Sequence, residues 1–188
     1  MHRIGRRTLL KAGISAGLGL GFFTPRPSGG QDDPAAVRPK KGDLLVKAGD
    51  SVKRPLTPDD IRLGAAPIMA WAMDPRTRTV RRGSRLNQVL LVRLDAGKLS
   101  PQTRSRAVRG VVAYTAICTH TGCEVDDWIG DEQVLHCSCH GSKFDPTDGA
   151  KVVEGEAPRP LPALPLKLNR GRLLIAGPYT ARVGFQPA

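Results

Sequence analysis

Short runs of apolar and β-branched residues alternate with turn residues along most of the chain. The runs are bounded by Gly, Pro, Asn or Asp, residues that commonly end extended segments. The segments expected to form strands are 44–46, 68–73, 88–94, 110–117, 133–136, 151–153 and 164–176. Within the last segment, Asn169-Arg170-Gly171 has the composition of a tight turn between two hairpin strands. Short strands at this spacing predict an all-β fold.

The first 23 residues have the pattern of a targeting segment rather than of a fold. Arg6-Arg7 is followed by Leu9-Leu10-Lys11 and then by an uncharged run over 12–23, an order that resembles a twin-arginine export signal. The run is shorter than the roughly 17–25 residues of a membrane span. Two outcomes stay open: a short anchor on the periplasmic face of the inner membrane, or a cleaved signal and a soluble periplasmic protein.

The next segment, 24–42, is rich in Pro and Gly and has almost no apolar side chains. This composition is typical of a linker or an unstructured arm. The folded domain is therefore expected over 43–188, a length sufficient to bury a core.

Positive charge is concentrated in the first part of the chain. The net charge is +12, and the first 110 residues hold 22 Lys and Arg against 8 Asp and Glu. The interval 74–109 has ten Arg or Lys against two Asp and is interpreted as a basic insertion, with a long exposed loop over 95–109. Such a surface is either simply solvated or docks an acidic partner or an anionic membrane. Nucleic acid is not an expected partner, because no aromatic residue is interleaved with these charges.

All four cysteines fall within 22 residues, in the segments C-T-H-T-G-C at 118–123 and C-S-C-H-G-S at 137–142. One selection of ligands from them gives two thiolates and two imidazoles: Cys118, His120, Cys137 and His140. Such a set binds zinc tetrahedrally, or a 2Fe-2S cluster with two Cys on one iron and two His on the other. Cys123 and Cys139 then remain, and in an exported protein they are expected to form a disulfide.

The two segments resemble the Rieske iron–sulfur protein family, in the form found in the Rieske subunit of quinol:cytochrome c reductase. The resemblance covers about residues 110–176 and implies antiparallel sheets with the cluster at the tip of a small subdomain, at about 115–160. It implies that Cys118 and Cys137 bind the buried iron and that His120 and His140 bind the outer one.

Further residues match this family, and two depart from it. Residues 155–158 resemble the Gly-Pro-Ala-Pro loop that covers the cluster, with Glu156 in place of a proline. Phe144 stands where quinol-oxidising members usually carry a tyrosine whose hydroxyl donates to a cysteine sulfur. The missing hydrogen bond is expected to lower the potential within the Rieske range of about −150 to +300 mV. The residues expected to line the cluster are Gly122, Gly141, Ser142, Phe144 and Pro158.

The resemblance implies an electron carrier in which proton and electron transfer are coupled at the histidines. His140 would accept a hydrogen bond from a quinol of a cytochrome b/c complex, and the electron would pass to a c-type cytochrome. An alternative is the small Rieske subunit of a periplasmic molybdenum enzyme such as arsenite oxidase, with the basic interval docking the large subunit. A third, from another class, is a structural module that holds zinc. His136 is interpreted as a structural or surface side chain and not as a ligand.

Overall fold

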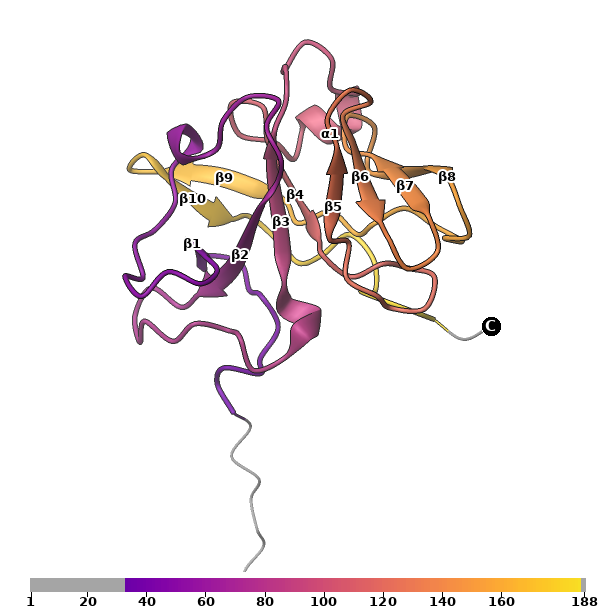
Figure 1. The fold of residues 1–188 in the computed structure, drawn as a ribbon. Helices are drawn as coiled ribbons and strands as arrows, with labels where there is room; N and C mark the ends of the chain where they lie inside the picture. The colour runs from indigo at the N-terminus through magenta and orange to yellow at the C-terminus, as the bar shows by residue number, and fades with distance from the viewer. Residues whose placement is uncertain (1–32, 187–188) are drawn as a thin grey trace, which may run out of the picture. The chain divides into compact units, whose positions relative to one another are not determined.

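The segments predicted as strands form two antiparallel sheets in a computed structural model that describes residues 33–186 (Figure 1). The first sheet has six strands in the order β4-β3-β2-β1-β10-β9, and the second has four in the order β5-β6-β7-β8. The strands of the first sheet are β1 (Leu44–Lys47), β2 (Ile68–Met73), β3 (Val89–Arg93), β4 (Val111–Thr115), β9 (Leu166–Asn169) and β10 (Arg172–Ile175). Those of the second are β5 (Asp127–Ile129), β6 (Val134–Cys137), β7 (Ser142–Asp145) and β8 (Lys151–Glu154). The predicted all-β class is confirmed.

Helical structure within 33–186 is limited to three short segments. They are the 3-10 helices η1 (Pro58–Asp60) and η2 (Arg85–Asn87) and the one-turn helix α1 (Pro101–Arg104). No helix in this part of the chain has the length and apolar character needed to cross a membrane.

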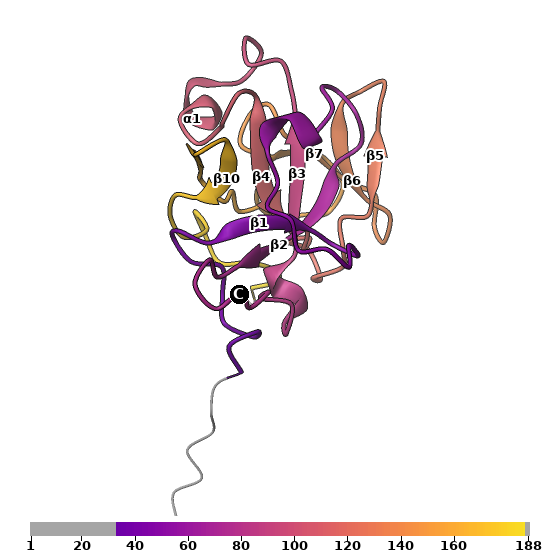
Figure 2. The same ribbon diagram turned by 90° about the vertical axis from the view of Figure 1, so that its left-hand side faces the viewer.

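The second sheet follows from β4 and returns the chain to β9. Its four strands are joined in sequence order as a meander, and β3 and β4 lie between it and the rest of the first sheet (Figures 1 and 2). The terminal hairpin of β9 and β10 pairs Asn169 with Arg172, and the turn residues Arg170 and Gly171 have φ of 49° and 76°. Positive φ at both positions belongs to the type I′ turn, as the turn composition predicts.

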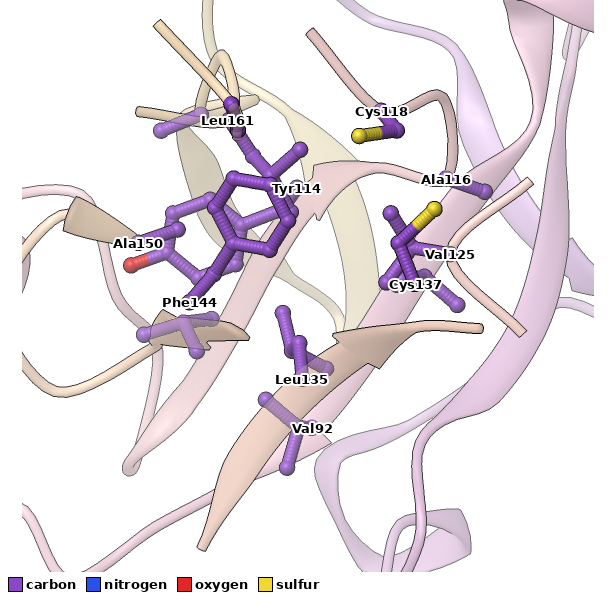
Figure 3. Close-up of a cluster of buried hydrophobic side chains, with 14 of the residues drawn as sticks. Val92, Tyr114, Ala116, Cys118, Val125, Leu135, Cys137, Phe144, Ala150 and Leu161 are labelled. Atoms are coloured by element: carbon purple, nitrogen blue, oxygen red, sulfur yellow. The ribbon is translucent and has the colours of Figure 1, made fainter. Parts of the chain in front are cut away.

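A hydrophobic core between the two sheets fixes the end at which the candidate site lies. Tyr114 of β4 and Phe144 of β7 are almost completely buried in this cluster (Figure 3). Each fully buried large apolar side chain contributes about 1.5–3 kcal/mol. Every residue of β4 is buried, because a second cluster covers the strand's other face. Figure 3 shows Cys118 and Cys137 on the side of the cluster where Ala116 and Val125 lie.

The exposed loop predicted for 95–109 is wrong in part, because its middle is anchored in the core. Leu99 and Thr103 are each only 3% exposed. The Ser100 hydroxyl accepts a hydrogen bond from the Thr103 backbone and caps α1, and the Thr103 hydroxyl accepts from the Gly149 backbone at 2.8 Å. The basic interval 74–109 is also not uniformly solvated, since Arg81 is buried.

Arg81 connects the start of the domain to the basic interval. Its guanidinium donates to both carboxylate oxygens of the buried Asp43, at 2.6 and 3.0 Å. This pairing satisfies both charges, which is the condition under which charged groups are buried.

The end of the predicted linker, residues 33–42, lies against the domain. The Asn87 side-chain amide donates to the Val37 carbonyl at 2.9 Å, and Arg38 donates to the Leu86 carbonyl at 2.8 Å. The predicted export signal or anchor over 1–23, and the linker up to residue 32, lie outside the described residues.

Candidate metal centre

Three loops meet at one end of the second sheet. Loop one spans 118–123 after β4, loop two spans 138–141 between β6 and β7, and loop three spans 155–159 after β8. Loop two is the turn of a hairpin, since Cys137 of β6 is in register with Ser142 of β7. Each loop therefore begins or ends at a strand of one of the two sheets.

Loop one closes on itself. The Cys118 backbone N–H donates to the Cys123 carbonyl at 2.8 Å, and Ile117 pairs with Glu124 as an isolated antiparallel bridge. Gly122 has φ of +81°, which glycine adopts without steric cost. The two ends of the loop are consequently held side by side, with His120 at its tip.

A disulfide joins loop one to loop two. Cys123 and Cys139 are bonded, with their Cα atoms 6.5 Å apart, so the predicted pairing is present. A second link runs beside it: the Ser138 hydroxyl donates to the Asp126 carboxylate at 2.6 Å and the Ser138 backbone donates to it at 3.1 Å. The hydrogen bond from the Ser138 hydroxyl lowers the pKa of Asp126, so the carboxylate stays a good acceptor.

The other two cysteines, Cys118 and Cys137, are free thiols, each only 1% exposed. Burial, and secondarily the neighbouring Cys118, raises the pKa of the Cys137 thiol to about 11. The Cys137 thiol is therefore protonated at neutral pH unless a metal ion replaces the proton. Two soft donors at the edge of a core are suited to iron or zinc.

The two candidate histidines lie next to each other at the tip. The ring centroids of His120 and His140 are 4.6 Å apart, and their planes meet at 81°. The Nδ1 atom of His120 is buried and has no hydrogen-bond partner among the described residues, whereas its Nε2 atom is 3.5 Å from the Glu156 carboxylate. A buried ring nitrogen without a partner is costly, and a metal bond would satisfy it.

Loop three packs closely on the first residue of β7. Gly155 has φ of +87°, and a Cβ placed on it would lie 2.4 Å from the Ser142 Cα. The Ala157 backbone donates to the Ser142 hydroxyl at 3.1 Å, which leaves the hydroxyl hydrogen free to donate elsewhere. Pro158 is exposed within this loop.

A further hydrogen bond links loop three to loop one. The Thr119 hydroxyl donates to the Arg159 carbonyl at 2.7 Å, and the Arg159 guanidinium in turn donates to the Gly184 carbonyl. Thr119 and Arg159 are structural residues that the sequence patterns do not identify, because neither belongs to the set of metal-binding side chains.

Phe144 lies behind the site in the core and not on its surface. It is fully buried, opposite Leu135 of β6, two residues before Cys137. His136 points away from the proposed ligands, and its Nδ1 lies 3.1 Å from the Asp127 carboxylate at the surface. That contact is consistent with a structural rather than a ligating role.

The residues present fit a cluster with mixed sulfur and nitrogen ligands. Two buried thiols lie below, and two imidazoles lie at the exposed end, one with an unpartnered inward nitrogen. The loops bring together every residue of the predicted ligand set, and the disulfide, Ser142, Gly122, Gly141 and Pro158 surround it. The contact between Glu156 and His120 is not apparent from the sequence pattern.

Comparison with known proteins gives consistent results. Residues 71–165 match the family described as the Rieske [2Fe-2S] domain. A Streptomyces lividans protein named as the cytochrome bc1 complex Rieske iron-sulfur subunit is 31% identical over 149 residues, which are 77% of this chain and 85% of that protein.

A second relative is named as a subunit of a different complex. A Haloferax mediterranei protein named as a candidate Rieske subunit of a respiratory nitrate reductase is 45% identical over 78 residues. The match is 41% of this chain and 34% of that protein, so this chain spans about a third of that relative's length. Among solved structures, the soluble domain of Rieske protein II from Sulfolobus acidocaldarius has 25% identity and a TM-score of 0.39, over 50% of this chain and 65% of that one.

Proposed function

This chain belongs to the Rieske iron–sulfur family and carries a Rieske-type 2Fe-2S cluster, and from that premise we propose that it is the iron–sulfur subunit of a quinol:cytochrome c reductase-type complex. The observation that carries the proposal is the arrangement of the candidate ligands: the two thiols are buried, and the two imidazoles lie at the outer end of the site. The Streptomyces relative with the corresponding name supports it, because the alignment extends over most of both chains.

In this proposal each ligand pair holds one iron. Cys118 and Cys137 hold the inner iron, in surroundings that exclude water, and His120 and His140 hold the outer one. The bound cluster supplies one-electron redox chemistry at a potential above that of clusters with four cysteine ligands. Ser142, whose hydroxyl accepts from Ala157, has its own hydrogen available for a sulfide.

The exposed histidine is the expected contact for the electron donor. His140 is exposed, whereas His120 is half-buried and has the Glu156 carboxylate at its outer nitrogen. A quinol hydroxyl would therefore donate its hydrogen bond to His140, which takes the proton as the electron leaves the quinol. A c-type cytochrome would then receive the electron at the same exposed end.

The second candidate is the small Rieske subunit of an exported molybdenum oxidoreductase. The Haloferax relative, named for a nitrate reductase, and the phenylalanine at position 144 favour it. The zinc-binding structural module left open by the donor set alone is set aside, because the family match and the bc1 relatives imply the iron–sulfur cluster.

We also propose export by the twin-arginine route, with membrane association through the N-terminal segment. The support is the order of Arg6-Arg7 and the uncharged run over 12–23. Replacing both arginines with lysines is expected to retain the protein in the cytoplasm. Export at the wild-type level would contradict the proposal.

The test of partner identity is purification of the tagged full chain from its native membranes in mild detergent. We expect b-type haem to co-purify together with quinol-dependent reduction of cytochrome c. A His140→Cys variant should abolish this activity and change the cluster spectrum. Co-purification of molybdenum without b-type haem would instead support the second candidate.

A further inference from the structure

We propose that Glu156 is a positioning residue for the cluster: its carboxylate lies against the outer nitrogen of His120, and its negative charge lowers the reduction potential. This inference rests on the proposed ligand set. The contact joins His120 Nε2 to Glu156 Oε2 at 3.5 Å, and ligand atoms of His120, His140 and Glu156 all lie within 4.8 Å of one another. The family's loop carries proline at this position, so the contact belongs to this chain's own sequence.

The orientation of the His120 ring gives its two nitrogens different roles. Nδ1 is buried and unpartnered among the described residues, so it is the atom available to an iron. Nε2 is then the nitrogen that keeps its hydrogen, and it faces the carboxylate. A metal-bound imidazole whose other N–H donates to a carboxylate is held in one tautomer and one orientation.

The backbone of loop three holds Glu156 in place from both sides. On one side, Gly155 is pressed against Ser142 in a conformation that favours glycine. On the other side, the Ala157 N–H is bonded to the Ser142 hydroxyl at 3.1 Å. The side chain is 63% exposed, but its Cα is fixed between two anchored residues.

Glu156 also differs from its nearest acidic neighbour in having no cationic partner. Among the described residues, its one ion-pair contact is with His120. Glu154, two residues earlier, lies 2.8 Å from the Lys143 ammonium, which it shares with Glu132. The negative charge of Glu156 is therefore directed at the outer end of the cluster, where it favours the more positive, oxidised state.

A lower potential narrows the class of electron donor. Such a cluster takes an electron efficiently only from a donor of correspondingly low potential, so we expect a low-potential quinol rather than a high-potential one. The absence of a hydroxyl at Phe144 is expected to act in the same direction, as the sequence resemblance implies.

The test is a redox titration, followed by EPR, of the full-length protein with its cluster. Glu156→Gln removes the charge and keeps the shape. It should raise the midpoint potential by about 59 mV, which corresponds to a tenfold change in the reduced-to-oxidised ratio. Glu156→Asp should retain most of the wild-type potential. Glu154→Gln is the matched control, and it should leave the potential unchanged.

The outcomes separate this inference from the proposed function. A wild-type protein without a Rieske EPR signal would overturn the ligand set itself. A normal signal with equal potentials in the wild type and Glu156→Gln would overturn the role of Glu156. Equal upward shifts in Glu156→Gln and Glu154→Gln would also overturn it, because they would reflect overall charge and not the contact with His120.

Discussion

Replacing Gly155 with alanine tests whether the close packing of loop three against β7 holds the cluster site together. A Cβ on Gly155 would lie 2.4 Å from the Ser142 Cα, 2.7 Å from its nitrogen and 2.8 Å from the Gly141 carbonyl oxygen. All three are backbone atoms, so rotation of a side chain cannot relieve these short contacts. Loop three, which carries Glu156 and Pro158, must therefore move outward.

The expected cost has two parts. Positive φ in a residue with a Cβ costs about 1–2 kcal/mol, and overpacking adds about 1–3 kcal/mol. The sum for Gly155→Ala is about 2–5 kcal/mol in the free energy of unfolding. Gly149 provides the control, because its φ is +67° and a Cβ there would meet no atom within 4 Å. Gly149→Ala should therefore lose only the first part, about 1–2 kcal/mol.

The measurements are urea unfolding and cluster content per chain, the latter from the EPR signal amplitude. Gly155→Ala should lose more stability than Gly149→Ala and should also carry less cluster. Equal losses of stability in the two variants, with full cluster content in both, would refute the reasoning that loop three depends on this close approach.

The remaining predictions concern other parts of the site and the domain. Phe144→Tyr should raise the midpoint potential through a new hydrogen bond to a cysteine sulfur. An unchanged midpoint potential in a potentiometric titration would show that the new hydroxyl does not reach that sulfur. Cys123→Ser, which opens the disulfide, should lower the free energy of urea unfolding by about 3 kcal/mol; a change below about 1 kcal/mol would contradict this. The Arg54 hydrogen bond holds the pKa of Asp60 at about 2, below its ordinary 3.8. The contribution of the Arg54–Asp60 pair to the stability of the folded state is present above about pH 4 and is lost as the pH falls from about 4 to about 2. Urea unfolding of the wild type should show a loss across this window that is about 1 kcal/mol larger than the loss in Asp60→Asn, since Asp74, Asp126, Asp127 and Asp148 also have lowered pKa values and contribute equally in both proteins.

Strands with a clear apolar pattern could be predicted from the sequence. The expected segment 68–73 coincides with β2, and 88–94 and 110–117 contain β3 and β4. β5 and β7 were not predicted, because they are only three and four residues long, and one of the three side chains of β5 and three of the four of β7 are polar. Such strands form because their neighbours in the sheet offer hydrogen bonds, not because of their own pattern.

The residues of the candidate site could likewise be predicted only in part. The two Cys–His segments predicted the ligand set and the disulfide, because metal ligands and paired thiols need particular residue types at short spacing. The contact of Glu156 with His120 depends instead on the backbone conformation at Gly155 and on its packing against Ser142. Neither feature is visible in a local pattern.

The most direct test of the central claim is an EPR-monitored redox titration of the protein purified from the membrane and soluble fractions of its native cells, repeated at several pH values. The account predicts a one-electron Rieske signal with a potential between about −150 and +300 mV that falls as pH rises, since the reduced state binds more protons at the histidines. A protein that contains zinc and gives no EPR signal on reduction would contradict it.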